Sequence, residues 1–306
     1  MEPALSDSWK LSAEASKERV QAALLVHDEI EDWDPELVIA GREMGEDRPQ
    51  DWVLEAWYPR RPGKAQKAAL LGLFEGDPPP VKTEKLPAQD WLALSQQGAR
   101  PVRAGPFHIH TPEFESDVTA IDLVIPAAQA FGTGQHHTTA GCLEMLAAMK
   151  ASGMHPRRIA DIGTGTGLLA MGSIALWPAA FVTASDIDPV CAPVVEENAA
   201  LNALRLGTGR GELALIIAAG MDDELLRLRG PYDLLIANIL AAPLIDLAPS
   251  FAASVAPGGS VLLAGLLAGE QEEAVRRAYK RAGFRPAARL VRGDWAILWM
   301  RRRRAR

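Results

Sequence analysis

Hydrophobic residues in the second half of the chain gather in short runs that alternate with amphipathic stretches. Five of these runs have the length and composition of buried strands: Arg158–Ile162, Phe181–Ile187, Leu213–Ala219, Tyr232–Ala237 and Ser260–Gly265. Helices are predicted between or after them, at Leu168–Ala175, Pro189–Asn202, Leu244–Val255 and Glu270–Ala282. Such alternation is typical of a parallel sheet with helices on both faces. The pattern therefore predicts an α/β fold, and two last apolar runs, Phe284–Val291 and Trp295–Met300, are expected to pair antiparallel at its edge.

The first part of the chain has a different pattern, which predicts a small α+β module over residues 1–75. Its expected elements are a helix over Lys17–Ile30, a strand over Asp51–Tyr58 and a second helix over Lys64–Phe74. A Gly-Asp-Pro-Pro-Pro segment at 76–80 cannot continue a helix. We therefore expect residues 76–115 to be a linker and residues 116–306 to be the main domain.

Composition narrows the function classes. The 306 residues carry a net charge of −7, which argues against a broadly nucleic-acid-binding surface and suits a basic protein partner. The run Arg301–Arg304 departs from this balance; it is either a solvated tail or a contact for RNA phosphates. Only Cys142 and Cys191 occur, without a C-x-x-C pair, and no apolar run is long enough to span a membrane. The start of the chain also lacks the order of a signal peptide, so a cytoplasmic protein is expected.

The strongest local signal is the glycine-rich segment 161–167, Asp-Ile-Gly-Thr-Gly-Thr-Gly, between a predicted strand and a predicted helix. Alternate glycines permit positive φ angles and let a ligand approach the main chain. A dinucleotide fingerprint would need its third glycine at position 168, which is Leu168, and the lysine of a P-loop is absent. The D-x-G-x-G-x-G spacing is instead similar to the first motif of class I methyltransferases; the alternative is a purely structural turn.

A carboxylate stands at the end of the next predicted strand. Asp186 can accept hydrogen bonds from both hydroxyls of a ribose, which favours it as the second cofactor residue. Asp188 is the alternative, but because Pro189 follows it, it fits better as the N-cap of the next helix.

Two further segments carry candidate chemistry. The first, Ala130–Thr139, reads Ala-Phe-Gly-Thr-Gly-Gln-His-His-Thr-Thr and is predicted to be a lid, whose hydroxyls cap the following helix or reach a ligand carboxylate. Its adjacent histidines have no acidic or thiol partner at ligand spacing, so no metal site is expected. The second is Asn238 at the end of a predicted buried strand. Its side chain and the carbonyls of Asn238 and Ile239 can orient an attacking amine, or Asn238 simply caps the next helix.

The chain resembles the bacterial ribosomal protein L-eleven methyltransferases over about residues 116–300. The resemblance rests on four motifs in this order: A-F-G-T-G-x-H-x-T-T, D-x-G-x-G-x-G, D-I-D-P and N-I-L. The resemblance implies a class I methyltransferase (Rossmann-like) sheet and a small N-terminal substrate-recognition domain. It further implies that S-adenosylmethionine is the cofactor, and that lysine side chains and the N-terminal amine of ribosomal protein L-eleven receive the methyl groups. Cofactor contacts would fall on Thr139, Gly163, Asp186 and Asn238, with Asn238 also the catalytic residue beside the transferred methyl group.

Two other functions stay open at this point. A glutamine methyltransferase of release factors would share the fold, but it is expected to have N-P-P-Y where this chain has Asn238-Ile239-Leu240-Ala241. A nucleotide-binding module without methyl transfer would need only the glycine-rich segment and Asp186.

Overall fold

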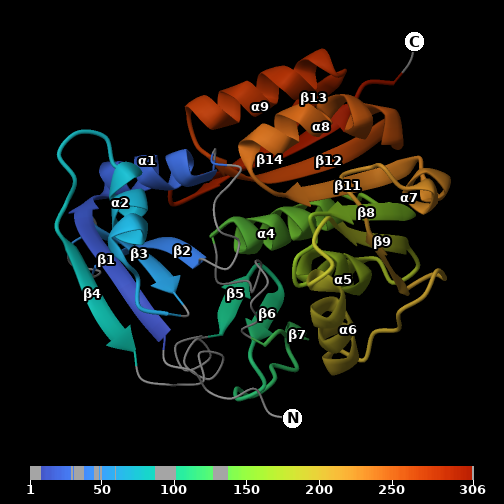
Figure 1. Ribbon diagram of the computed structural model, residues 1–306. Helices are drawn as coiled ribbons and strands as arrows, with labels where there is room; N and C mark the ends of the chain where they lie inside the picture. The colour runs from blue at the N-terminus through green and yellow to red at the C-terminus, as the bar shows by residue number, and fades with distance from the viewer. Residues whose placement is uncertain are drawn as a thin grey trace. The chain divides into compact units, whose positions relative to one another are not determined.

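The computed structural model of the chain describes residues 8–28, 30, 38–44, 48, 50–58, 60–86, 101–126 and 137–304. The chain divides into two compact units, Met1–Leu94 and Ser95–Arg306 (Figure 1). In the described part of the chain, no helix combines the length and the apolar character that a membrane span requires.

The N-terminal unit is an antiparallel sheet with two helices packed on one face. Its strands are β1 (Ser8–Ser16), β2 (Val38–Glu43), β3 (Asp51–Tyr58) and β4 (Val81–Leu86), in the order β2-β3-β1-β4. The helices are α1 (Lys17–Asp28) and α2 (Lys64–Gly72). Leu11, Leu54, Val20 and Leu70 are buried in one common core. Because these residues come from two strands and both helices, the helices cover the same face of the sheet.

The domain boundaries differ from those predicted at residues 75 and 115. β4 pairs with β1 inside the N-terminal unit, although it lies in the predicted linker. In β4 the side chains of Lys82, Glu84 and Lys85 are exposed, and only Val81 and Leu86 are apolar, so the strand lacks an apolar run that would predict it. The predicted linker also contains β5 (Val102–Ala104) and β6 (Phe107–His110), which belong to the second unit.

The second unit is built on a seven-stranded sheet in the order β10-β9-β8-β11-β12-β14-β13. Its strands are β8 (Arg158–Ile162), β9 (Phe181–Asp186), β10 (Leu213–Ile217), β11 (Tyr232–Asn238), β12 (Val255–Leu267), β13 (Phe284–Arg292) and β14 (Trp295–Arg302). The first five strands are parallel, and β14 runs antiparallel to β12 and β13. This confirms the predicted α/β fold and the predicted antiparallel pair at the edge.

Helices cover both faces of this sheet (Figure 1). They are α4 (His137–Ala151), α5 (Leu168–Leu176), α6 (Cys191–Leu201), α7 (Glu224–Arg229), α8 (Ala241–Ser254) and α9 (Glu270–Arg281). On β11, Leu234 and Ile236 join the core beneath α4 and α5, whereas Leu235 and Ala237 join the core beneath α8 and α9. Alternate residues of β11 are therefore buried in two separate cores, which explains why apolar residues predominate on both faces of this strand.

A three-stranded sheet extends the core beneath α4 and α5. In it β5 pairs antiparallel with β6, and β6 pairs parallel with β7 (Ile121–Val124). Phe107, Ile109 and Leu123 are buried in the same cluster as residues of α4 and α5. These strands have only three or four residues, so their hydrophobic pattern is too short to predict them.

Candidate functional site

The glycine-rich loop has the backbone that its sequence requires. Gly163, Gly165 and Gly167 have φ angles of 71°, 54° and 79°, in the left-handed region that favours glycine. The backbone N–H groups of Gly163 and Thr164 both donate to the Ser185 carbonyl oxygen, at 2.8 and 3.0 Å. The loop is thus held against the end of β9, and α5 starts immediately after Gly167.

Asp161, the first residue of the motif, holds the glycine-rich loop in place through hydrogen bonds. Its Oδ2 accepts hydrogen bonds from the Thr164 hydroxyl at 2.7 Å and from the Ala170 N–H at 3.1 Å. Burial raises the pKa of this carboxyl to about 7, and the nearby charge of Asp186 adds to the rise. Asp161 is 1% exposed, so its role is to position the loop.

Asp186 lies half-buried at the end of β9 and faces the loop. Its Oδ2 accepts the Gly165 N–H at 2.8 Å and its Oδ1 accepts the Asp188 N–H at 3.1 Å. Each carboxylate oxygen has further acceptor capacity for ligand hydroxyls. The alternative residue, Asp188, is exposed and accepts the Val190 N–H at 2.9 Å, ahead of α6. Its side chain thus closes the turn before the helix.

Asn238 ends β11 and contacts the first turn of α4. Its Nδ2 donates to the Thr139 hydroxyl oxygen at 3.3 Å, and Thr139 is 1% exposed. Its Oδ1 is buried and has no hydrogen-bond partner within the described part of the chain. A buried amide oxygen without a partner is costly for folding. Asn238 therefore presents an acceptor suited to a ligand or substrate hydrogen.

Packing around Ile239 joins the loop to the Asn238 segment. A Cβ added at Gly163 would lie 2.2 Å from Ile239 Cγ2, and one added at Gly265 would lie 2.2 Å from the Ile239 carbonyl oxygen. Gly163 thus has to be glycine for packing as well as for its positive φ. The role of Gly265, which lies two residues before the end of β12, was missed because only the fold brings it to Ile239.

The structure brings the predicted site residues together. Gly163, Asp186 and Asn238 stand at the carboxyl ends of β8, β9 and β11, which are neighbours in the order β9-β8-β11. Thr139 contacts Asn238 from α4. The chain order of the strands reverses between β8 and β11, and ligands bind at such switch points in open α/β sheets. The rest of the predicted lid, at 130–136, lies outside the described residues.

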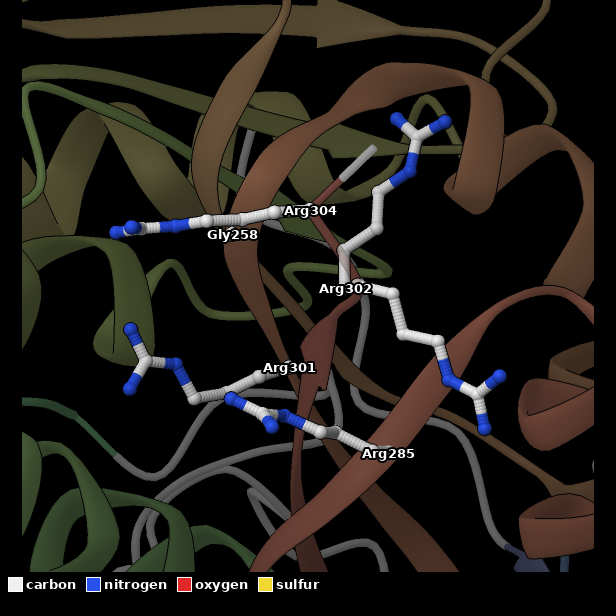
Figure 2. Close-up of a pocket in the computed structure, with 6 residues that line it drawn as sticks. Gly258, Arg285, Arg301, Arg302 and Arg304 are labelled. Carbon is white, nitrogen blue, oxygen red and sulfur yellow. The ribbon is translucent and has the colours of Figure 1, made fainter. Parts of the chain in front are cut away.

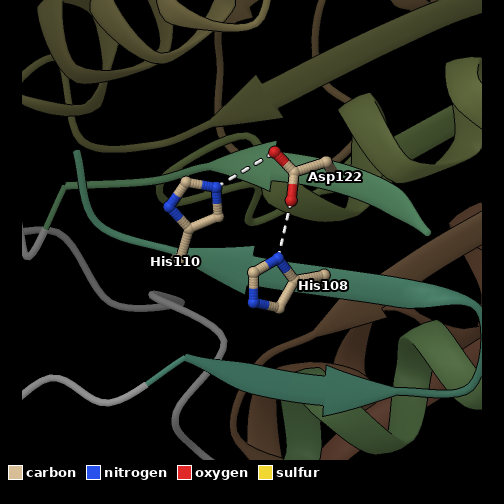
Figure 3. Close-up of side chains that lie close together, drawn as sticks. All are labelled: His108, His110 and Asp122. Carbon is tan, nitrogen blue, oxygen red and sulfur yellow. Dashed lines mark hydrogen bonds and ion pairs between the residues drawn. The ribbon is translucent and has the colours of Figure 1, made fainter. Parts of the chain in front are cut away.

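A second cluster of polar side chains lies on β6 and β7, in the three-stranded sheet (Figure 3). His108 Nδ1 and Asp122 Oδ1 are 2.6 Å apart, and His110 Nε2 and Asp122 Oδ2 are 3.0 Å apart. The three side chains offer ligand atoms within 4.8 Å of one another, a set of nitrogen and oxygen donors that can hold a transition metal. These residues are not the adjacent histidines at 136 and 137, for which no metal site was expected. The signal in the sequence is the His-x-His spacing at 108 and 110, which puts both rings on one face of a strand.

We expect Asp122→Asn to destabilise the second unit in a pH-dependent way. Burial alone would raise the pKa of Asp122, but hydrogen bonds from the Asp117 N–H, His110, His108 and Ser116 outweigh it and hold this pKa well below its usual range. The carboxylate therefore stabilises the fold above the unfolded pKa of about 3.9, and this stabilisation is lost as the pH falls through the folded pKa. Chemical denaturation at pH 7 should show a loss of about 1–3 kcal/mol.

The same measurement near pH 3 should show a smaller difference between Asp122→Asn and the wild type. The exposed Asp246 on α8 offers a control, because Asp246→Asn should change stability little at either pH. A pH-independent loss in Asp122→Asn would contradict an ionic contribution from this cluster.

Comparison with known proteins places the chain in a family. The model of the family described as ribosomal protein L11 methyltransferase matches residues 17–303. A ribosomal protein L11 methyltransferase of Rhizobium meliloti is 44% identical over 227 residues, which are 73% of this chain and 75% of that protein. One of Agrobacterium fabrum is 42% identical over 224 residues, covering 72% and 74%.

A solved structure agrees with the sequence comparisons. The ribosomal protein L11 methylase of Lactobacillus delbrueckii subsp. bulgaricus matches with a TM-score of 0.56 and 28% identity, over 66% of this chain and 98% of that one. The relatives found thus share sequence with this chain over most of its length, and one of known structure shares its fold. The chain belongs to the ribosomal protein L11 methyltransferase family.

Proposed function

We propose that this protein transfers methyl groups from S-adenosylmethionine to amino groups of ribosomal protein L11, on lysine side chains and at the N-terminus. Family membership supports the substrate and the methyl donor. The single observation that carries the chemistry is the buried Asn238 Oδ1, which has no partner in the described part of the chain and stands beside the glycine-rich loop. Because the substrate is a ribosomal protein, the proposal also places the reaction in the cytoplasm.

The residues at the strand ends fit an adenosyl cofactor. The loop around Gly163 offers main chain without a Cβ, and Asp186 would accept hydrogens from the ribose hydroxyls. Thr139 and Asn238 would lie beside the methionyl part, where both offer side-chain oxygens. When bound, S-adenosylmethionine supplies an electrophilic methyl group on a positively charged sulfur.

The amine that receives the methyl group has to be neutral. A lysine with a pKa of about 10.4 loses its proton at pH 7 at a cost of about 4.6 kcal/mol, and an α-amine with a pKa of about 7.8 at a cost of about 1 kcal/mol. Desolvation of the amine lowers this cost. The chain's own contribution is an acceptor that holds a hydrogen of the amine and aims its lone pair.

The Asn238 side chain is the better candidate for this acceptor. The sequence also suggested the carbonyl of Ile239, but its oxygen faces Gly265, 2.2 Å from the position that an added Cβ would take. Among the described residues Asn238 Oδ1 has no hydrogen-bond partner, and the contact of Nδ2 with Thr139 holds the side chain in place. We therefore assign the orienting role to the side chain of Asn238.

The proposal is tested by incubating the protein with ribosomal protein L11 and isotopically labelled S-adenosylmethionine. Mass spectrometry of the intact substrate and of its peptides should show label on lysine side chains and on the N-terminal amine. Label on glutamine of release factors instead would favour the alternative methyltransferase, which family membership does not favour.

Gly163→Ala is expected to weaken S-adenosylmethionine binding by at least about tenfold, because an alanine here combines a strained φ with a steric clash. Gly153→Ala is a matched control. Gly153 has a φ of 85°, but a Cβ there meets no atom within 4 Å, so it isolates the backbone strain. Calorimetric titration and thermal unfolding of both variants measure the two effects. Equal cofactor affinity in both variants would show that packing at Gly163 does not shape the site.

A further inference from the structure

A pocket of about 600 Å³ is lined almost wholly by arginines (Figure 2). Its lining residues are Gly258, Arg285, Arg301, Arg302, Arg303 and Arg304. They come from the start of β12, the start of β13 and the end of β14 with the residues that follow. Neither the glycine-rich loop nor Asn238 takes part in it.

The pocket lies at the opposite end of the sheet from the strand ends that form the candidate methyl-transfer site. Arg301 pairs with Ser260 near the start of β12, whereas Asn238 pairs with Ala264 further along the same strand. Gly258, which lines the pocket, precedes Ala264 by six positions, or about 20 Å of extended strand. The arginine pocket is therefore a separate feature of the second unit.

The positive charge of the arginine pocket is not neutralised by ion pairs within the described residues. Within the described residues, none of these five guanidinium groups forms an ion pair, although Arg302 donates to the Val255 carbonyl oxygen. Arginines close by in the chain are paired: Arg289 with Glu272 at 2.5 Å, and Arg292 with Glu144 at 3.5 Å. The concentration of unpaired arginines is thus local, in a chain whose net charge is −7.

The arrangement also works against the stability of the sheet. Arg285 and Arg301 stand directly opposite each other on β13 and β14, and like charges in that position repel. Figure 2 shows the guanidinium groups of Arg285, Arg301 and Arg304 extending to the same side of the strand ends, while that of Arg302 extends the other way. Guanidinium groups spread over two sides suit an extended polyanion better than a single small ion.

We infer that this arginine pocket binds the phosphodiester backbone of RNA. Guanidinium forks match phosphate oxygens in bidentate hydrogen bonds, and several of them along a surface give sequence-independent binding. The identification of RNA rests on the proposed function. A basic protein surface would be repelled by the pocket, whereas the phosphates of the RNA to which a ribosomal protein binds would be attracted. The pocket would then hold RNA of the substrate complex at the end of the sheet away from the methyl-transfer site.

The test is fluorescence anisotropy of the full-length protein with a labelled RNA hairpin over a range of salt concentrations. The test variant carries three substitutions, Arg285→Gln, Arg301→Gln and Arg304→Gln. The matched control removes the same charge elsewhere in the unit, with Arg205→Gln, Arg210→Gln and Arg277→Gln, three exposed arginines that form no ion pair within the described residues. The pocket variant should lose at least about tenfold in affinity, and the slope of log affinity against log salt should fall by about 2 to 3. The control should stay within about twofold of the wild type.

Equal losses in the two triple variants, or unchanged binding in the pocket variant, would overturn the inference. Displacement of the RNA by a polyglutamate peptide of equal charge at equal concentration would also overturn it, because the pocket would then be a general site for acidic peptides. Arg301→Gln alone should give a smaller loss in the same direction, which keeps the test valid if the triple variant does not fold.

Methylation of RNA-free ribosomal protein L11 separates this inference from the proposed function. The pocket variant should methylate the free protein at the wild-type rate. If neither protein methylates it while RNA binding behaves as expected, the proposed function fails and the RNA site stands.

Discussion

Replacing Asn238 with alanine is expected to slow amine methylation by roughly tens to thousands of times while the fold is retained. The change removes the buried Oδ1 that would hold a hydrogen of the amine, together with the Nδ2 contact to Thr139. Steady-state kinetics with ribosomal protein L11 should show the loss in kcat, because the acceptor acts on the attacking amine. Thermal unfolding should be close to that of the wild type, since Asn238 ends its strand and is only half-buried.

At saturating S-adenosylmethionine, Thr139→Val separates positioning of Asn238 from its direct action in the same experiment. It removes the hydroxyl that accepts from Asn238 Nδ2 but leaves the Asn238 oxygen in place. A smaller loss than that of Asn238→Ala is therefore expected. Near-normal turnover in Asn238→Ala would remove this residue from the mechanism.

Deleting residues 1–94 is expected to abolish methylation of ribosomal protein L11 and to spare binding of S-adenosylmethionine. The second unit has both of its hydrophobic cores within its own residues, and all four predicted cofactor contacts belong to it. The N-terminal unit has a separate core, as expected of a domain that folds independently. We propose that it holds the protein substrate.

The position of the cut matters for this experiment. A deletion that ends at residue 75, as the sequence alone would suggest, leaves β4 without β1, its partner in the sheet. The deletion that ends at residue 94 removes the whole unit. Calorimetry with S-adenosylmethionine confirms that the truncated protein is folded. If that protein still methylates ribosomal protein L11 at the wild-type rate, the N-terminal unit is not the docking site.

The central sheet could be predicted because its strands are buried on both faces. β8 and β11 consist mainly of buried apolar residues; β8 leads directly into Gly163, and β11 ends at Asn238. By contrast, β1 alternates polar and apolar residues, a period of two that is typical of a half-buried strand but was not used for the prediction. Its partner β4 has only two apolar residues, Val81 and Leu86, so its sequence does not show a strand. β5 and β6 are too short for any period to be recognised.

The candidate site likewise contains some residues that local sequence predicts and some contacts that only the fold creates. Local sequence was sufficient for Gly163 and Asp186, because a loop motif and a strand end place them. The contact between Asn238 and Thr139 joins residues 99 positions apart, and only the packing of α4 against the sheet creates it. The same holds for Gly265 beneath Ile239 and for the cluster of His108, His110 and Asp122, whose members meet through strand pairing.

Calorimetric titration of the wild-type protein with S-adenosylmethionine and, separately, with NAD tests most directly whether the ends of β8, β9 and β11 form a methyl-donor site. We predict saturable heat with S-adenosylmethionine and none with NAD, and an affinity for S-adenosylmethionine at least about tenfold weaker in Asp186→Ala, which loses the ribose acceptor. Binding of NAD as tight as that of S-adenosylmethionine, or an unchanged affinity in Asp186→Ala, would contradict this assignment.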